Sequence, residues 1–127
     1  MENVIIIVRN HQDKFLLHKR SWNKKIFPGR YGIGCGGKID RHLEEEPLEA
    51  AYRELREELD IFGVELKFLF EKENAIVYYL YWNGIYKDNC SEFDWIGWVD
   101  RNKISKYDLC DDTRLIWKEY LDEHTIK

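Results

Sequence analysis

The segment that most restricts the fold is an amphipathic stretch that begins near Glu46 and ends at Leu59. Its apolar residues recur at a spacing of about 3.6 residues, which places them on one face of an α-helix. These residues are Leu48, Ala51, Tyr52, Leu55 and Leu59. Pro47 suits the first turn of a helix, and the acidic residues around it favour the positive end of the helix dipole. The sequence therefore predicts a helix over residues 46–59 that buries its apolar face.

Short runs of β-branched and aromatic residues on both sides of this helix predict strands. The expected strands cover residues 3–10, 14–21, 64–73, 75–83 and 93–100. Residues 111–124 predict a second helix, with Asp111 or Asp112 at its N-cap. The resulting order is strand, strand, loop, helix, three strands and helix. This order implies an α/β fold in which a mixed sheet carries helices on its faces.

Length, charge and cysteine content restrict the class of protein. A chain of 127 residues fits a single domain over residues 1–127. The net charge is -4 with both signs interspersed, so no basic stripe indicates a nucleic-acid polymer as partner. Three cysteines without metal-ligand spacing fit reduced thiols in the cytoplasm. The apolar run Val4–Val8 is too short for a membrane span or a signal peptide, so we expect a cytoplasmic protein without a membrane partner.

A glycine-rich segment from Gly29 to Gly37 precedes the first predicted helix. Glycine at this density indicates tight backbone turns or the close approach of the backbone to a bound molecule. We expect this segment to be a loop that brings backbone and ligand next to the helix.

Three glutamates, Glu54, Glu57 and Glu58, share a strip of the predicted helix roughly opposite its apolar face. Glu54 and Glu58 are four residues apart, and like charges so placed cost roughly 0.2–0.5 kcal/mol. Carboxylates gathered in this way suit a hard cation such as Mg²⁺, which prefers oxygen ligands. A solvated acidic face, neutralised by neighbouring arginines, would produce the same pattern. The helix alone leaves both interpretations open.

Residues 36–61, GGKIDRHLEEEPLEAAYRELREELDI, resemble the signature of the Nudix hydrolase family. That signature reads Gly, five residues, Glu, seven residues, Arg-Glu, an aliphatic residue, any residue, Glu-Glu, any residue, Gly and an aliphatic residue. Residues 53–58 fit its helical half without a gap. The resemblance implies an α/β/α sandwich with a mixed sheet.

The chain departs from the signature at two places. Gly37 precedes Glu45 by eight residues where the signature has six, which indicates a two-residue insertion. Either Glu44 or Glu45 could therefore fill the first glutamate position. Asp60 stands where the family has glycine, and aspartate is tolerable there if the position needs a left-handed conformation.

The resemblance also implies a reaction, a cofactor and residue roles. The expected reaction is Mg²⁺-dependent hydrolysis of a nucleoside-diphosphate-linked compound, with a (d)NTP converted to the (d)NMP and pyrophosphate and with Mn²⁺ as a substitute metal. Glu54, Glu57 and Glu58 would be metal ligands, and Arg53 would hold the first glutamate of the signature in a salt bridge. Glu54, or Glu92 in a later loop, would accept the proton of the attacking water.

Residues 28–38 and 110–117 also resemble segments of MutT-type members of the family, in which they line a base pocket. This resemblance implies a small-molecule nucleotide as the partner and leaves a homodimer open. The substrate-binding candidates are Ile33, Cys35, Gly36, Gly37, Lys38, Asp111 and Asp112.

Two other functions remain to be tested. Residues 27–37 resemble the stretch around a catalytic cysteine of isopentenyl-diphosphate isomerase, which would give Cys35 a chemical role. The histidines of the chain do not supply the metal-binding pattern of that enzyme, whereas the hydrolase helix is intact. A catalytically silent Nudix-fold binding module is the third alternative.

Overall fold

The computed structural model describes residues 1–124. In this part of the chain, seven strands form one sheet, and two helices and two short 3₁₀ turns accompany it. The strands are β1 (Asn3–Arg9), β2 (Lys14–Arg20), β3 (Tyr31–Ile33), β4 (Cys35–Lys38), β5 (Lys67–Lys72), β6 (Ala75–Tyr81) and β7 (Phe93–Asp100). The helices are α1 (Pro47–Leu59) and α2 (Asp111–His124), and the 3₁₀ turns are η1 (Arg41–Leu43) and η2 (Arg101–Lys106).

The sheet is mixed and is built around β1. This strand pairs in parallel with β6 and antiparallel with β2 and β4, while β2 also pairs with β3 and β7. β1 meets β2 at Arg9 and Phe15, next to the turn that joins them. From Asn3 to Ile6, β1 pairs with β4 instead. The two long strands therefore diverge, and the glycine-rich segment lies where they separate.

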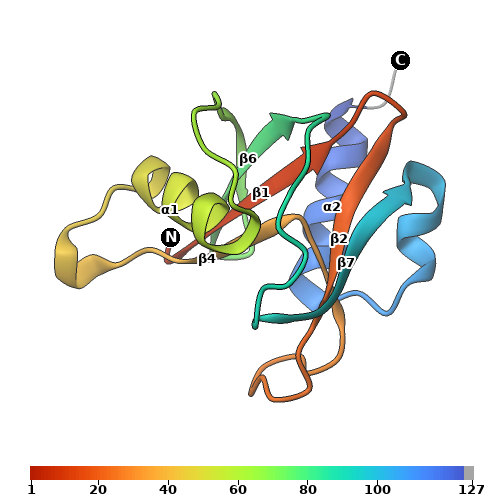
Figure 1. The fold of residues 1–127 in the computed structure, drawn as a ribbon, viewed down its shortest axis with the longest axis horizontal. Helices are drawn as coiled ribbons and strands as arrows, with labels where there is room; N and C mark the ends of the chain where they lie inside the picture. Colours follow the sequence, from red (N-terminus) through yellow and green to blue (C-terminus); the bar gives the residue numbers. More distant parts are fainter. Residues whose placement is uncertain (125–127) are drawn as a thin grey trace.

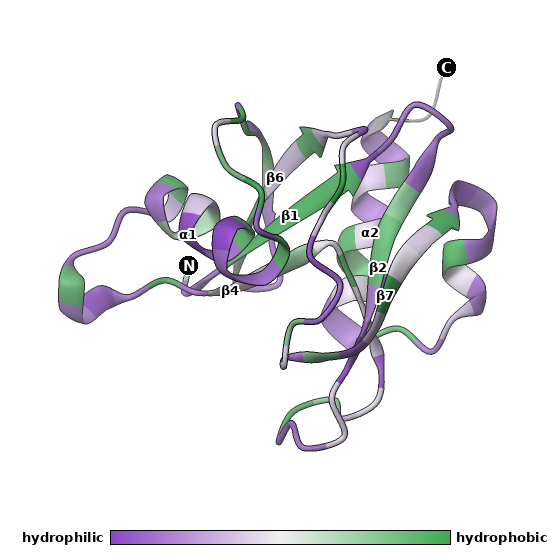
Figure 2. Cartoon of the chain, in the orientation of Figure 1, coloured by the Kyte–Doolittle hydropathy of each residue, from purple (hydrophilic) through white to green (hydrophobic). Residues whose placement is uncertain are grey.

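Alternate residues of the strands enter two separate hydrophobic cores. Ile6 and Leu16 pack with Leu55 and Leu59 of α1, whereas Ile7, Leu17 and their neighbours pack with α2 through residues such as Trp117. Successive side chains of a strand point to opposite faces, so this division places the helices on opposite sides of the sheet. Figure 1 shows this arrangement, and Figure 2 shows β1 as hydrophobic along most of its length. The predicted α/β/α sandwich is confirmed.

The first predicted helix is confirmed at both ends. Glu46 is its N-cap, and a capping box joins this residue to Glu49. Asp60 at the C-cap has a φ of 56°, so the left-handed conformation expected of that position is present. The predicted burial of Leu48 is wrong: its side chain is 42% exposed. Leu48 lies in the first turn of α1, next to the projecting η1 segment in Figure 1, whereas Ala50 of the same turn is buried in the core.

The prediction of a loop for the glycine-rich segment is also wrong, because residues 31–38 form β3 and β4. Gly34 joins the two strands with a φ of +60° and donates its backbone N–H to Leu16 O at 2.8 Å. A Cβ at this position would lie 1.7 Å from Ile6 O. Only glycine can therefore carry the chain from β3, which pairs with β2, to β4, which pairs with β1.

No helix among residues 1–124 combines the length and hydrophobicity that a membrane crossing requires.

Candidate active site

Two glutamates of α1 face two glycines of β4. The Gly36 N–H donates to Glu58 Oε1 at 3.0 Å. A Cβ on Gly37 would come within 2.5 Å of Glu54 Oε1. The absence of a side chain on Gly37 thus leaves room for Glu54, whereas a Cβ on Gly36 would clash with Val4 O of β1. The sequence stretch with the highest glycine density is, for this reason, the stretch against which the acidic helix packs.

Arg53 orients the acidic residues around it. Its Nε and Nη2 donate to both oxygens of Glu45 at 2.6 and 2.9 Å. Its Nη1 donates to Glu54 at 2.7 Å and to Glu57 at 3.3 Å. The guanidinium of Arg53, together with the backbone N–H of Asp40, lowers the pKa of Glu45 to about 2. Arg53 therefore holds one carboxylate of the preceding turn in a bidentate pair and limits the movement of two carboxylates on its own helix.

The two-residue insertion is accommodated by η1. Asp40 caps this turn by accepting the N–H groups of His42 and Leu43, and Glu44 ends it with a φ of 53°. The chain then returns so that Glu45 N donates to Asp40 O at 3.1 Å. The extra residues project away from the sheet, and Glu45 rather than Glu44 meets Arg53.

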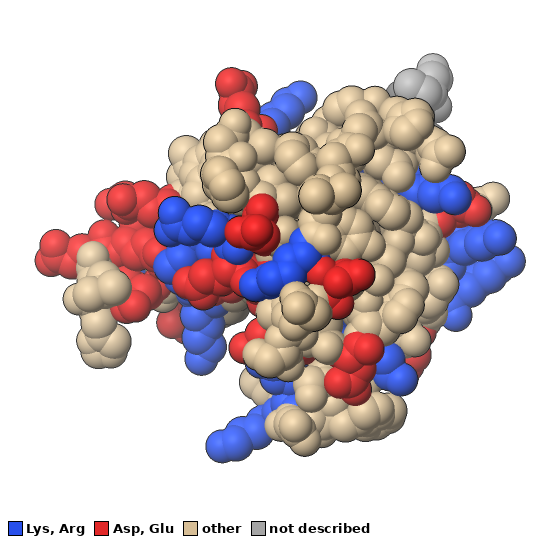
Figure 3. Space-filling view, viewed as in Figure 1, with Lys and Arg blue, Asp and Glu red and all other residues tan. Residues whose placement is uncertain are grey.

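The three glutamates differ in exposure, which the helical wheel did not predict. Glu58 is 8% exposed, whereas the side chain of Glu57 is 56% exposed. The helix packs closely on the glycines of β4, and this packing buries Glu58. Acidic side chains nevertheless crowd over α1 and the turn before it (Figure 3).

Burial changes the ionisation of the two inner carboxylates. Burial, and then the charge of Glu54, raises the pKa of Glu58 to about 8. Burial also raises the pKa of Glu54, and the neighbouring Arg53 opposes this shift. Two carboxylates are thus placed together with too little positive charge around them. Among residues 1–124, no three His, Cys, Asp or Glu side chains already converge into a complete metal site.

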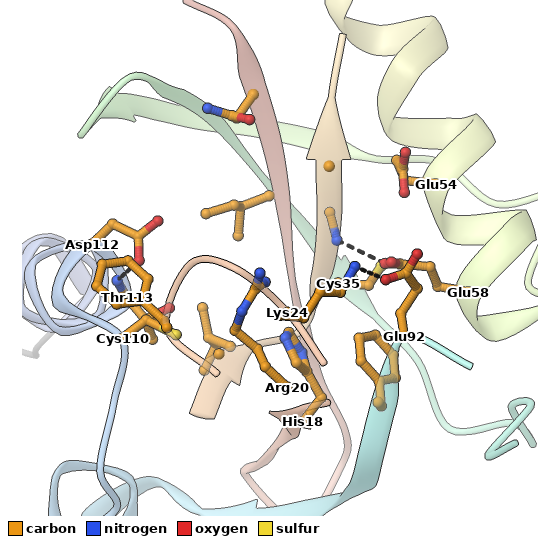
Figure 4. Close-up of a pocket in the computed structure, with 18 of the residues that line it drawn as sticks. His18, Arg20, Lys24, Cys35, Glu54, Glu58, Glu92, Cys110, Asp112 and Thr113 are labelled. Atoms are coloured by element: carbon orange, nitrogen blue, oxygen red, sulfur yellow. Dashed lines mark hydrogen bonds and ion pairs between the residues drawn. The ribbon is translucent and has the colours of Figure 1, made fainter. Parts of the chain in front are cut away.

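These carboxylates line a cavity of about 500 Å³. Figure 4 shows it between α1, β4 and the start of α2. Nearly all of the predicted substrate-binding residues lie on its wall, as does Glu92. They are Ile33, Cys35, Gly36, Gly37, Lys38 and Asp112. The structure therefore brings these sequence predictions together around one cavity with Glu54 and Glu58, although their roles stay predictions.

Glu92 lies beside the inner carboxylates and is not free. It forms an ion pair with Lys24, and the pair lies near Glu58 in Figure 4. Lys24 also opposes the rise in the pKa of Glu58. A basic side chain from the loop after β2 thus supplies part of the positive charge that the site otherwise lacks.

The two aspartates at the start of α2 have different positions. Asp111 pairs with Arg30 at 3.1 Å and does not contribute to the cavity wall described above. Asp112 lines the cavity, and its Oδ1 accepts the N–H of Thr113 at 2.8 Å. Both residues lie in the first turn of α2, which begins at Asp111, so the prediction that one of them is the N-cap is wrong.

His18 and Phe93 also line the cavity, and neither is among the site residues predicted from the sequence. The position of His18 could have been predicted from the way successive side chains of β2 alternate between the two faces of the sheet. His18 is two residues from Leu16, which packs under α1, so both side chains belong on the face of the sheet that carries the glutamates.

Comparison with known proteins identifies the family. A family-wide sequence profile described as the NUDIX domain matches residues 1–117. The "Uncharacterized Nudix hydrolase YfcD" of Escherichia coli K12 is 35% identical over 77 residues, which cover 58% of this chain and 42% of that protein. The matched region is therefore less than half the length of this curated relative.

Two solved structures share the fold. The MutT protein from Methanosarcina mazei Go1 has a TM-score of 0.77 and 25% identity, with coverage of 98% of this chain and 94% of that one. The NUDIX domain of Shewanella oneidensis NrtR, solved with ADP ribose, has a TM-score of 0.78 and 18% identity, with coverage of 97% and 87%. The profile spans nearly the whole chain, and both structures share its sheet and helices. The chain therefore belongs to the Nudix hydrolase family.

Proposed function

We propose that this protein is a Mg²⁺-dependent pyrophosphohydrolase that converts a (d)NTP, or a related nucleoside-diphosphate-linked compound, to a nucleoside monophosphate and a second phosphate product. One observation carries the proposal: Glu54 and Glu58 line the same cavity as the glycine backbone of β4 and the basic side chains Arg20, Lys24 and Lys38. A phosphate chain could contact these cations while its scissile bond lies next to the carboxylates.

The donor set fits a hard divalent cation. Glu54 and Glu58 offer carboxylate oxygens, and their raised pKa values indicate that the pair lacks a compensating charge. Mg²⁺ and Mn²⁺ both accept carboxylate oxygens and keep positions for water and phosphate. Glu57 lies one residue before Glu58 and would be the third ligand. When bound, the metal would neutralise phosphate oxygens and acidify a water molecule.

The protein's own residues would orient the substrate and move the proton. Arg53 holds Glu54 by a hydrogen bond of 2.7 Å, which limits the rotation of that carboxylate. Water would attack phosphorus as the bond to the leaving phosphate oxygen breaks. Either Glu54 or Glu92 would take the water's proton. For Glu92 to do so, Lys24 must leave its ion pair, and an incoming phosphate offers Lys24 an alternative anion.

Two further observations bear on the alternatives. The NrtR domain was solved with ADP ribose, a nucleoside-diphosphate-linked compound, which supports this ligand class for the shared fold. Cys35 is 1% exposed, and burial raises the pKa of its thiol well above the usual value. A thiol so buried between the sheet and α1 supports a packing role rather than the chemistry expected of an isomerase.

The test is to incubate the full chain with Mg²⁺ and a panel of nucleoside triphosphates, ADP ribose and isopentenyl diphosphate. Products are separated by chromatography, and pyrophosphate is measured as phosphate after adding inorganic pyrophosphatase. We expect nucleoside monophosphate formation that stops on chelation of the metal, and no change in isopentenyl diphosphate. Nucleotide binding without any hydrolysis would instead identify a binding module, and isomerisation would overturn the proposal.

A further inference from the structure

His18 is a buried titratable side chain to which the proposed reaction assigns no role. It is 8% exposed, lies on β2 opposite Gly32 of β3, and lines the cavity. The ring stacks on Phe93, with centroids 4.2 Å apart and planes inclined by 22°. The side chain is therefore held in one orientation at the cavity wall.

The hydrogen bond of His18 fixes its tautomer. Nδ1 lies 2.7 Å from Gly34 O. A carbonyl oxygen only accepts, so Nδ1 must carry the proton and Nε2 must present a lone pair. Burial lowers the pKa of His18 to about 4, with smaller contributions from the positive charges of Arg20 and Lys24. The ring is thus neutral near pH 7, and Nε2 is a hydrogen-bond acceptor.

Gly32 lies close to the Nε2 edge of the ring. A Cβ on Gly32 would lie 2.6 Å from Nε2, closer than real side-chain contacts allow. Within residues 1–124, the hydrogen bond of the His18 ring runs from Nδ1, and no donor is found for Nε2. Gly32 and His18 both line the cavity, which places this edge of the ring at its wall.

The position of His18 within the cavity indicates which part of a ligand it meets. Figure 4 shows Glu54, Glu58 and Glu92 at one end and Cys110, Asp112 and Thr113 at the other, with His18 between the two groups. If phosphate lies by the glutamates, the remainder of the substrate extends past His18 toward the start of α2. Asp112 there is a second acceptor, because an ionised carboxylate has no hydrogen to donate.

We infer that His18 Nε2 accepts a hydrogen bond from an exocyclic amino group of the nucleobase, and that the cavity selects amino-bearing bases through this contact. This inference rests on the proposed nucleotide site and names the kind of base that the site accepts. A base lacking the amino group would leave Nε2 unpaired in a buried place, which costs affinity.

Nucleoside monophosphates test the inference without turnover or metal. Binding is measured by calorimetry for matched pairs that differ by one amino group: the monophosphates of adenosine and purine riboside, of guanosine and inosine, and of cytidine and its 4-deamino analogue. In at least one pair we expect the amino-bearing member to bind wild type about tenfold more tightly, the effect of one lost buried hydrogen bond.

Two variants remove the acceptor in different ways. His18→Asn keeps an N–H near the position of Nδ1, so it can still donate to Gly34 O, but it has no atom in place of Nε2. Gly32→Ala keeps the histidine, but its methyl group would clash with the ring at Nε2, so the ring must leave its position. In both variants, the affinities for the two monophosphates of the selective pair should differ by no more than about twofold. His18→Gln can place an amide oxygen near the Nε2 position and should restore part of the preference. Thermal melts show which variants are folded.

A spectroscopic measurement separates contact from packing. In wild type, the ¹⁵N resonance of the unprotonated His18 Nε2 should move when the amino-bearing monophosphate binds and stay in place with its partner. The inference fails if no pair is distinguished, if no monophosphate binds, if His18→Asn weakens both members of a pair equally, or if the resonance moves equally with both. Hydrolysis without base preference would refute only this inference, whereas base preference without hydrolysis would refute only the proposed reaction.

Discussion

The Gly36 N–H and the Glu58 carboxylate meet at 3.0 Å, and this contact joins β4 to α1 at the wall of the cavity. It gives the buried carboxylate of Glu58 a backbone hydrogen-bond donor from the sheet against which the helix packs. At the next residue along the strand, the absence of a side chain on Gly37 leaves room for the carboxylate of Glu54. The site is thus formed by backbone on one side and carboxylates on the other.

Gly37→Ala should disturb this arrangement directly. The added methyl group would lie 2.5 Å from Glu54 Oε1, so the carboxylate or the helix must shift. We expect a loss of roughly 1–3 kcal/mol in the free energy of unfolding, typical of overpacking, and a fall in turnover of at least about tenfold. Urea denaturation and steady-state kinetics measure the two effects. Wild-type values of both would show that the close approach has no importance.

Glu57→Gln should reduce metal-dependent turnover by orders of magnitude at little cost in stability. The Glu57 side chain is 56% exposed and its contact with Arg53 is 3.3 Å, so the folded state depends on it only weakly. The substitution keeps the shape but removes the charge of a proposed metal ligand. Turnover and the Mg²⁺ concentration for half-maximal rate are compared with Glu65→Gln, an exposed glutamate outside the cavity. Equal kinetics for the two variants would exclude Glu57 as a ligand.

Arg53→Lys should lower kcat because a lysine cannot make the bidentate contact with Glu45 and also reach Glu54. The carboxylates would then lose their fixed orientation, and we expect a decrease of at least about tenfold. Arg56→Lys, three positions further along α1 and exposed, is the matched control. If both variants have the same kcat, the salt bridge does not orient the site.

Asp112→Asn and Asp111→Asn should differ in base selectivity. Asp112 lines the cavity, whereas Asp111 pairs with Arg30 and has a side chain that is 74% exposed. We expect Asp112→Asn to change the ratio of kcat/KM values among bases by about fivefold or more, the lower end of the cost of an unpaired hydrogen bond. Asp111→Asn should leave the ratios unchanged. Uniform losses in both variants, together with lower melting temperatures, would assign both aspartates to the helix terminus.

Local signals in the sequence were sufficient for α1 and for the carboxylates it carries, because helical spacing and caps lie within one short segment. Asp60 is an example: its left-handed conformation follows from its place after the last helical turn. β3 and β4 were mistaken for a loop because their stability comes from pairing with β2 and β1, which are distant in sequence. The choice between Glu44 and Glu45 also required the structure, since only the path of η1 decides which one reaches Arg53.

The pH dependence of stability should reveal the buried, neutral state of His18. Burial lowers its pKa from 6.5 to about 4 in the folded chain, with Arg20 and Lys24 adding to the effect. Between these pH values the unfolded chain binds a proton that the folded chain does not bind, so the free energy of unfolding decreases as the pH falls. This contribution is fully present above pH 6.5 and is lost as the pH approaches 4. Its upper limit is about 3 kcal/mol.

His18→Asn cannot titrate and serves as the reference variant. The unfolding free energies of wild type and this variant are measured by urea denaturation at pH 7 and at pH 4.5. The difference between the two proteins should shrink as the solution is acidified. A difference that stays constant over this range would mean that His18 titrates alike in the folded and unfolded chains, and that its Nε2 is not held as a buried acceptor.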